Sequence, residues 1–431
     1  MLRGSAKLCV FLSVFFLSMR MGGTLESPNL KPSEIFIALA AILTFIHLVQ
    51  IKFRVGPDFQ KFLIKIFLLL GVFYLSLFAG TFISSLNFNN LPIKLIGMEY
   101  FRISIAILFF LLVIFYGVRD KNFVRLTFFA FLSPLIVAFI GRIPQAVEAL
   151  GMTGGGTRFK GFFSDPNYFA NFSIIAVIFL FVAALKTNWR LYQKILCGTG
   201  ATLIMSTIWW SGSRSGWAGI IVGFLVASVT IIRFSSSRVK ISAAALITFI
   251  AILSTGFFLL DDRQKTDTFA RTGYYFDFKK GVGPGGENAT DQSFIRALPL
   301  IIYAQPKRLQ HGQDRKNLWF QSLGYSTENP LGFGPGYHRL VNLKTGNEGH
   351  RAVHGVIFEI ILTAGVIGLI LFGIGGYFLI KDWLMIKKPD YVWIGTYAAL
   401  IGVLASSLFL DSLNLRWLWT LGAMLTALNK K

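Results

Sequence analysis

The chain has 431 residues and carries a formal net charge of +22 at pH 7. Hydrophobic residues make up 54% of it and charged residues only 14%, and the mean hydropathy is +0.62. Such a composition has too little polar surface to cover a water-soluble globule, so we expect the bilayer to be the main solvent. The Lys and Arg residues lie mostly in short loops between apolar runs, which argues against a nucleic-acid-binding protein.

About twelve apolar runs are candidates for membrane-spanning helices, each of which needs roughly 20 apolar residues. In chain order they are 7–22, 33–51, 61–83, 100–118, 122–141, 167–185, 191–211, 215–232, 239–260, 353–380, 391–409 and 413–428. The fold class predicted is therefore an all-α polytopic membrane protein. The first run also resembles a signal peptide, because Arg3 and Lys7 precede Leu8–Met19. No small-residue cleavage pattern precedes Thr24, so we predict a retained helix.

Positively charged residues gather in every second loop between these predicted helices. With a cytoplasmic N-terminus, the inside loops receive Lys52, Arg54, Arg119, Lys121, Lys186, Arg190, Lys194, Arg233, Arg238, Lys240, Lys381, Lys387, Lys388, Lys430 and Lys431. This is the positive-inside pattern of membrane proteins. The outer face then receives 23–32, 84–99, 142–166, 211–216, 261–352 and 410–413.

The predicted organisation has three parts, which are residues 1–260 with the first nine helices, 261–352 as one large outer loop, and 353–431 with the last three helices. The outer loop is too long for a simple connection in a compact protein, so we expect it to be functional. Ser293–Ala304 and Arg315–Leu323 have helical patterns. Gly281–Gly286 and Asn329–Gly336 are rich in turn residues.

Four of the five histidines lie in this loop or where the chain re-enters the membrane, namely His311, His338, His350 and His354. Histidine takes and returns a proton near neutral pH, so one of them is a candidate general base. A solvated loop residue is the simpler interpretation for any one of them. His354 differs because it sits at the start of a predicted helix.

A metal site is the competing interpretation of this histidine cluster. His350 and His354 are four residues apart, which would suit one face of a helix, but no HExxH pattern exists. Cys9 and Cys197 lie in separate apolar segments, so a disulfide framework is not indicated either. We therefore predict no metal ion and no other cofactor.

Two arginines are candidate anion-binding residues. Arg214 stands between two apolar runs on the predicted outer side, where a cation at membrane depth indicates an anionic ligand or a water-filled cavity. Its Gly and Ser neighbours would let backbone N–H groups approach a phosphate at the start of the next helix. Arg315 belongs to the outer loop, and guanidinium suits bidentate phosphate binding. The simpler interpretations are a helix-end arginine for Arg214 and a solvated loop arginine for Arg315.

These features follow one another in a fixed order, as Arg158–Asn167, Ser213–Gly216, Arg315 to Trp319, Pro330–Gly336, His354–Glu359 and Ala364–Leu369. The order resembles the O-antigen ligase and O-antigen polymerase superfamily of bacterial membrane glycosyltransferases. The resemblance covers roughly residues 155–370. Each motif alone is weak, whereas the ordered set together with the predicted topology is fairly specific.

The resemblance implies that a glycan on undecaprenyl diphosphate moves to an acceptor hydroxyl in a cavity under the outer loop, without a metal ion. By resemblance, Arg214 and Arg315 hold the diphosphate and stabilise the charge that develops on it. His354 is the general base, and Arg158 supports donor binding. The family often has His-Asn where this chain has His354-Gly355. The implied location is the bacterial cytoplasmic (inner) membrane, with the site facing the periplasm.

Aromatic side chains of the outer loop could stack on sugar rings, and they are Trp319, Phe320, Tyr325, Phe333 and Tyr337. Trp319 and His338 are the candidate sugar contacts. Packing of the loop on the membrane is the simpler interpretation of these aromatics.

The resemblance leaves the acceptor open among lipid A-core for a ligase, another lipid-linked repeat for a polymerase, and a protein side chain for a third branch. We favour the ligase because the arginine–tryptophan and histidine motifs lie on one large loop before three closing helices. The partners expected are an undecaprenyl diphosphate-linked glycan donor, a lipid A-core or growing-glycan acceptor and membrane lipids, with no nucleic acid.

A transporter or lipid flippase is the rival from another class, since twelve spans would suit it. Transporters commonly have two related halves and helices broken near the bilayer midplane. Here the predicted spans divide unequally around the long loop, and the polar residues gather outside. We therefore favour the transferase.

Overall fold

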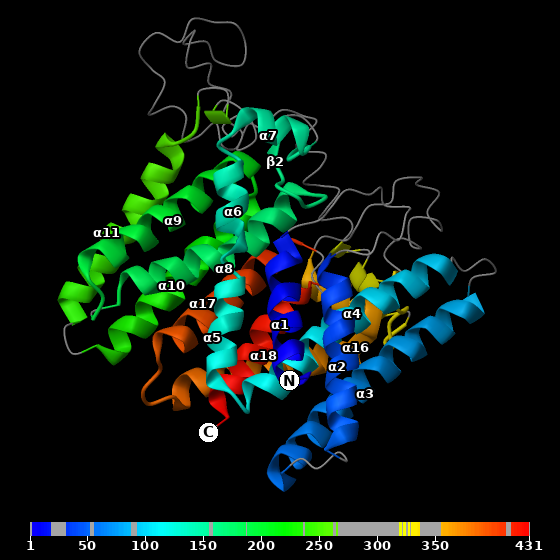
Figure 1. The fold of residues 1–431 in the computed structure, drawn as a ribbon. Helices are drawn as coiled ribbons and strands as arrows, with labels where there is room; N and C mark the ends of the chain where they lie inside the picture. The colour runs from blue at the N-terminus through cyan, green and yellow to red at the C-terminus, as the bar shows by residue number, and fades with distance from the viewer. Residues whose placement is uncertain are drawn as a thin grey trace, which may run out of the picture.

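The computed structural model describes residues 2–18, 32–51, 56–87, 93–154, 158–186, 188–235, 238–261, 264–265, 319–320, 322–324, 326–327, 329–336, 355–410 and 415–430. Within these residues the protein is a helical bundle with one short antiparallel hairpin, in which β1 (Thr153–Gly154) pairs with β2 (Arg158–Phe159). Figure 1 shows α3 and α16 on one side of the bundle, α9 and α11 on the other, and α8, α17 and α18 between them.

The helices are α1 (Leu2–Phe15), α2 (Pro32–Gln50), α3 (Pro57–Asn87), α4 (Ile93–Gly117), α5 (Lys121–Ala130), α6 (Ser133–Ile140), α7 (Pro144–Ala149), α8 (Pro166–Ala184), α9 (Leu191–Ser211), α10 (Arg214–Phe234), α11 (Arg238–Phe258), α16 (Val356–Met385), α17 (Tyr391–Ser407) and α18 (Arg416–Asn429), with a 3-10 helix at Phe16–Ser18. Each of the twelve predicted runs coincides with helix over most of its described residues. The run 122–141 is divided between α5 and α6 by a turn at Phe131 and Leu132, next to Pro134. Of the predicted loop helices, Ser293–Ala304 lies outside the described residues, and only part of Arg315–Leu323 lies within them.

Seven helical segments in the described part of the chain are long and apolar enough to cross a membrane. They are Pro32–Gln50, Pro57–Leu86, Ile96–Gly117, Lys121–Ile140, Pro166–Ala184, Arg214–Phe234 and Val356–Met385. The protein is thus an all-α multi-pass membrane protein. Two apolar helices, Ser242–Phe258 and Tyr391–Ser407, are shorter, so the count of twelve spans stays a prediction.

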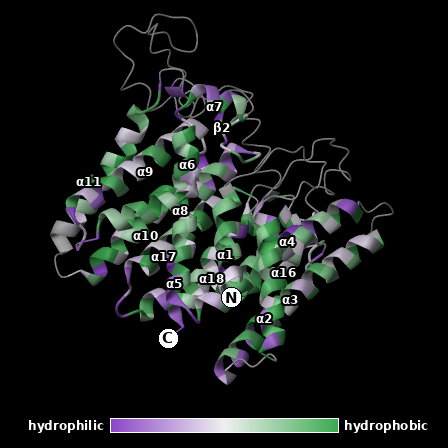
Figure 2. Cartoon of the chain, in the orientation of Figure 1, coloured by the Kyte–Doolittle hydropathy of each residue, from purple (hydrophilic) through white to green (hydrophobic). Residues whose placement is uncertain are grey.

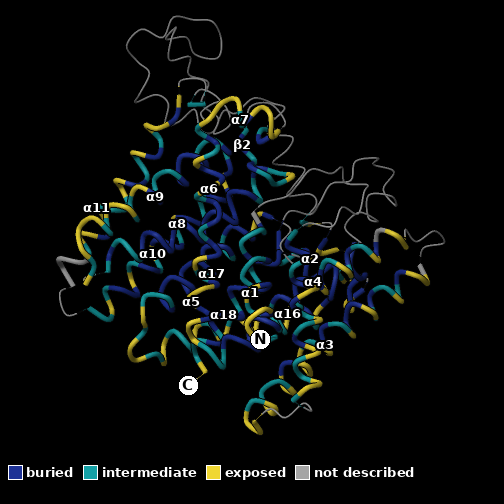
Figure 3. Tube along the Cα trace, in the orientation of Figure 1, coloured by how far each residue is buried: buried dark blue, intermediate teal, exposed yellow. Residues whose placement is uncertain are grey.

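The helices differ in how much of their apolar surface faces outward. In α3 only 17% of the most apolar window is buried, and in α8 78% is buried. Figure 3 shows this contrast as an exposed α3 at the edge and a buried α8 at the centre, while Figure 2 shows that the exposed edge is hydrophobic. Exposed apolar surface of this extent is expected where a helix faces lipid.

Small residues let the central helices α8, α10 and α17 approach closely. A Cβ atom on Gly216 of α10 would lie 2.7 Å from the Cβ of Ala170 in α8, and one on Gly219 would lie 2.6 Å from the carbonyl oxygen of Gly402 in α17. Membrane helices associate largely through such close packing, because lipid tails are as apolar as Leu. The start of α10, which carries Arg214, is therefore anchored between two other helices.

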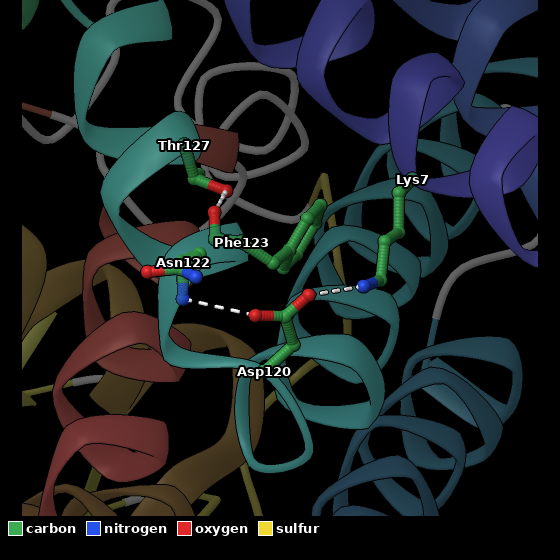
Figure 4. A network of polar contacts seen from close by, with 5 residues as sticks. All are labelled: Lys7, Asp120, Asn122, Phe123 and Thr127. Atoms are coloured by element: carbon green, nitrogen blue, oxygen red, sulfur yellow. Dashed lines mark hydrogen bonds and ion pairs between the residues drawn. The ribbon is translucent and has the colours of Figure 1, made fainter.

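The first apolar run, α1, packs into the bundle at Val10 and Val14, both of which are fully buried. Its Lys7 forms an ion pair with Asp120, the residue before α5. Figure 4 shows that the Asp120 carboxylate also accepts a hydrogen bond from the backbone N–H of Asn122, at 3.0 Å, and so caps α5.

The long helix α16 is broken at Gly365, where φ is 60° and ψ is −153°. The segment 329–336 lies against this break and forms backbone hydrogen bonds with it. Because these residues belong to the predicted outer loop, the contact joins that loop to the membrane-spanning part of the protein.

Candidate functional site

A tight turn joins α9 to α10 and places Arg214 at the first position of α10. Gly212 ends α9 with a φ of 59°, a backbone conformation that favours glycine. Ser213 then caps α10, since its Oγ accepts a hydrogen bond from the N–H of Gly216 at 3.2 Å. The buried hydroxyl groups of Ser213 and Ser215 lie 3.1 Å apart. The sequence Ser211–Gly216 thus folds into a rigid turn with Arg214 at its tip.

Arg214 is exposed, and among the described residues its guanidinium has no hydrogen-bond or ion-pair partner. The backbone N–H groups of Arg214 and Ser215 also donate to no described residue, as is usual for the first turn of a helix. A free guanidinium, free N–H groups and the positive end of the α10 dipole together favour an anionic ligand here.

Arg158 of β2 braces this turn from the side. Its Nε donates to the carbonyl oxygen of Ser211 at 2.6 Å, and its Nη2 donates to Oδ1 of Asn167, at the start of α8, at 3.2 Å. These two bonds hold the planar guanidinium between the end of α9 and the start of α8. The structure therefore brings Arg158 and Arg214 to the same turn, although they are far apart in sequence.

The hairpin that carries Arg158 rests on aromatic side chains. Phe159 is fully buried and stacks on Trp210 of α9, with ring centroids 4.8 Å apart. Nearby, Arg142 donates to the carbonyl oxygen of Leu259 at 2.7 Å and to the hydroxyl of Ser206. Burial lowers the pKa of the Arg142 guanidinium, and the Asp261 carboxylate opposes this shift.

Trp319 of the outer loop lies at the start of α16. Its ring stacks on Phe358, with centroids 5.1 Å apart and an interplanar angle of 12°. A Cβ atom on Gly355 would lie 3.7 Å from the Trp319 Nε1. Gly355 follows His354 directly in the chain, so Trp319 is held next to the segment that His354 precedes.

The end of α17 contacts both the start of α10, which carries Arg214, and Gly355, which lies beside Trp319. A Cβ atom on Gly355 would lie 3.0 Å from the carbonyl oxygen of Leu408, which follows α17. Two residues earlier in the chain, the Cβ of Ser406 is 2.9 Å from where a Cβ on Gly219 of α10 would lie. Gly219 is only five positions after Arg214, so the starts of α10 and α16 both border the end of α17.

Several predicted site residues lie outside the described residues, namely Arg315, His338 and His354, as do Tyr325 and Tyr337 of the aromatic set. Phe320 is 72% exposed. Phe333 is 6% exposed and packs inside the protein, so the prediction that it stacks on sugar was wrong and loop packing explains it.

A buried ion pair joins Arg416, the first residue of α18, to Glu34 in the first turn of α2. Arg416 also donates to the hydroxyl of Ser33 at 3.3 Å. The next residue, Trp417, packs edge-on against Phe163, in the loop between β2 and α8. Sequence reasoning missed this pair, although charges inside the apolar runs 33–51 and 413–428 were a signal of it.

Within the described ranges, no group of three His, Cys, Asp or Glu side chains could hold a metal ion. The prediction of a metal-free site includes histidines outside those ranges and stays a prediction.

Residues 199–373 match the model of a protein family described as O-antigen ligase. The matched stretch runs from α9 into α16 and contains Arg214, Arg315, Trp319 and His354, whereas Arg158 precedes it. The resemblance predicted from the ordered motifs is thereby confirmed at the level of the superfamily. No curated protein matches the chain.

Proposed function

We propose that this chain, a member of the O-antigen ligase-like superfamily, ligates O-antigen to lipid A-core at the periplasmic face of the bacterial inner membrane. The donor would be a glycan on undecaprenyl diphosphate, and the acceptor a sugar hydroxyl of lipid A-core.

This proposal depends mainly on the exposure of the Arg214 side chain and on its lack of a described partner. Arg214 is exposed at the start of α10, has no partner among the described residues, and stands beside N–H groups that are also free. Burying the rest of this turn while leaving its cation open suits a multivalent anion such as a diphosphate. Arg158 supports the same turn through the Ser211 carbonyl oxygen.

In the proposed reaction the acceptor hydroxyl oxygen attacks the anomeric carbon while the bond from that carbon to the diphosphate oxygen breaks. His354 takes the hydroxyl proton as general base. The bonding electrons leave with the diphosphate, whose charge Arg214 and Arg315 stabilise. A single displacement from the opposite face inverts the anomeric centre, and the leaving group is good enough to need no metal ion.

The break in α16 does not favour a transporter. It is at the tenth residue of a 30-residue helix, and the freed backbone groups bond to the outer loop, whereas the broken helices of transporters expose theirs to a central substrate site.

Purified protein supplied with lipid-linked donor and acceptor tests the proposal by the release of undecaprenyl diphosphate. Arg214→Ala should remove most turnover, because the diphosphate loses its exposed cation. Arg190→Ala is the matched control, since Arg190 is an exposed arginine that precedes α9 at the predicted cytoplasmic side. Equal turnover in both variants would contradict the assignment of Arg214, and absence of diphosphate release from the parent protein would favour transport.

The acceptor can be identified from the surface polysaccharide of a deletion strain. Loss of a ligase leaves long polymer on the carrier lipid, whereas loss of a polymerase leaves single repeats on the surface. A single-repeat phenotype would therefore replace the ligase with a polymerase of the same superfamily.

The periplasmic location of residues 261–352 is tested by single cysteines at Asn288 and Asn342 in a background without Cys9 and Cys197. An impermeant thiol reagent should label both in cells with a permeable outer membrane and an intact inner membrane. Protection until the inner membrane is breached would overturn the predicted topology.

A further inference from the structure

The segment 329–336 takes over hydrogen bonds that a continuous α16 would make within itself. In an unbroken helix the N–H of Val366 would donate to the carbonyl of Leu362. Instead, Val366 donates to the carbonyl oxygen of Pro330 at 2.8 Å, and the Leu362 carbonyl accepts from Phe333 at 2.7 Å. The Thr363 carbonyl likewise accepts from the N–H of Gly334 at 3.0 Å.

Only glycine fits where the segment meets α16. A Cβ atom on Gly365 would lie 2.2 Å from the Pro330 carbonyl oxygen, and one on Gly332 would lie 2.5 Å from the Gly365 nitrogen. Both glycines have positive φ values, 60° and 79°. The two backbones therefore touch through residues that have no side chain and that can adopt left-handed conformations.

The opposite side of the segment is fixed to α3. A Cβ atom on Gly80 would lie 2.5 Å from the Gly334 nitrogen, and one on Gly334 would lie 2.2 Å from the Oγ1 of Thr81. The hydroxyl of Ser84 donates to the Phe333 carbonyl oxygen at 2.6 Å. We call residues 329–336, with their contacts to α3 and to the break at Gly365, the glycine clamp.

A continuous helix would satisfy the backbone of α16 without this arrangement. Instead, Gly365 has a conformation that other residues rarely adopt, and a largely buried loop segment holds it in that conformation. An interrupted helix persists only where the surrounding structure replaces the missing hydrogen bonds, and such departures from regular structure often mark a functional site. What the break changes is the position of Val356–Ala364, the first part of α16.

We propose that the glycine clamp positions the first part of α16 for the glycan-transfer reaction, so that Gly332, Gly334 and Gly365 are positioning residues. This inference rests on the proposed function. The first part of α16 begins directly after Gly355, contacts Trp319 through Phe358, and follows His354 in the chain. Fixing it between the outer loop and α3 fixes the place where the proposed general base joins the helix.

Gly365→Ala tests the proposal, and Gly375→Ala is the matched control. A Cβ on Gly375 of the same helix would meet no atom within 4 Å, so this variant should match the parent protein. Gly365→Ala should expel the segment and close the helix. Because a displacement of about 1 Å near reacting groups costs about a hundredfold in rate, turnover should fall by roughly that factor. Donor affinity should fall much less than turnover, since Arg158 and Arg214, two of the proposed diphosphate ligands, make no described contact with the clamp.

A cross-link reports on the clamp without any need for activity. Cysteines at Leu331 and Val366, in a background without Cys9 and Cys197, should be joined by a short thiol reagent in the parent and in Gly375→Ala, but poorly in Gly365→Ala. If Gly365→Ala does not fold, Ser84→Ala removes only the hydrogen bond to Phe333 and should lower turnover by about three- to tenfold at unchanged donor affinity.

The positioning role would be overturned by unchanged turnover in Gly365→Ala, by an unchanged cross-link in that variant, or by a parallel loss of donor affinity. The last result would mean that the clamp only supports the fold. A parent protein that cross-links but transfers no glycan would refute the proposed function and leave the clamp itself demonstrated.

Discussion

The Nε of Arg158 donates a 2.6 Å hydrogen bond to the carbonyl oxygen of Ser211, which lies 53 residues further along the chain. The bond ties the hairpin β1–β2 to the turn that presents Arg214. Since the donor is charged and partly buried, its loss should disturb the turn as well as remove a positive charge from the site.

Arg158→Ala should therefore weaken donor binding by about ten- to hundredfold, the equivalent of a charged hydrogen bond worth about 1.5–3 kcal/mol. Arg158→Lys should recover little, because an ammonium group cannot hold Ser211 and Asn167 together as a planar fork does. Binding of lipid-linked donor to the purified variants measures both effects.

Lys160→Ala is the control for Arg158, because it removes the same charge two residues away on the same loop without breaking the brace. It should bind donor nearly as the parent does. If Arg158→Lys also binds normally, then charge alone matters and the bond to Ser211 has no role in donor binding.

Trp319→Ala should lower turnover by about tenfold, because the stacking of Trp319 on Phe358 holds the outer loop against the start of α16. Trp319→Phe should keep most activity, since it preserves an aromatic ring. Phe320→Ala is the matched control, because the neighbouring Phe320 is 72% exposed. Steady-state transfer kinetics would reverse this assignment if the Phe320 variant lost more activity than the Trp319 variant.

The helices of the bundle were largely predictable, because a span must be long and apolar and such runs are visible in the sequence. The run 167–185 became α8, Pro166–Ala184, with Asp165 as its cap and Pro166 at its first position. The family resemblance was also readable, since it depends on motif order. The predicted run 215–232 likewise became α10, Arg214–Phe234, although its cap at Ser213 was not predicted.

The break in α16 was not predictable, because its cause is distant in sequence. The apolar pattern continues through Ala364, Gly365 and Val366, and a glycine alone does not break a helix. The break depends on hydrogen bonds from residues about thirty positions earlier, in the outer loop. The contact of Arg158 with Ser211 was not predictable for the same reason, since the sequence around each residue does not show which carbonyl group the arginine binds.

The ion pair between Lys7 and Asp120 should make the free energy of unfolding depend on pH in the acid range. The hydrogen bond donated by Lys7 is the main reason that the pKa of the Asp120 carboxyl lies below its ordinary value. A lowered carboxyl pKa contributes stability that is present above the ordinary value and is lost as pH falls through the lowered one, which means below about pH 4. Thermal unfolding in detergent between pH 3 and about pH 7 measures this dependence.

Asp120→Asn should flatten that acid dependence while keeping the cap on α5, because an amide oxygen can still accept from Asn122. Lys7→Ala and Asp120→Asn should each cost about 0.5–1 kcal/mol at neutral pH, and the double variant should cost little more than either one. Full additivity of the two losses would mean that the pair does not interact in the folded protein.

The position of His354, directly before Gly355 and α16, makes it the histidine on which acid–base chemistry should depend. His354→Ala should abolish glycan transfer and still bind lipid-linked donor, because the proposed ligands of the diphosphate are arginines. General acid–base assistance is typically worth about 10²–10⁴ in rate, so a loss below roughly tenfold in a correctly inserted His354→Ala protein would mean that the base is elsewhere. His311→Ala and His338→Ala are the controls and should cost much less.

In the parent protein transfer should also fall toward acid pH while donor binding persists, since a protonated imidazole cannot accept the hydroxyl proton. A His354→Ala protein with residual activity should lose this acid limb, and a limb that survived the substitution would have to be assigned to another group.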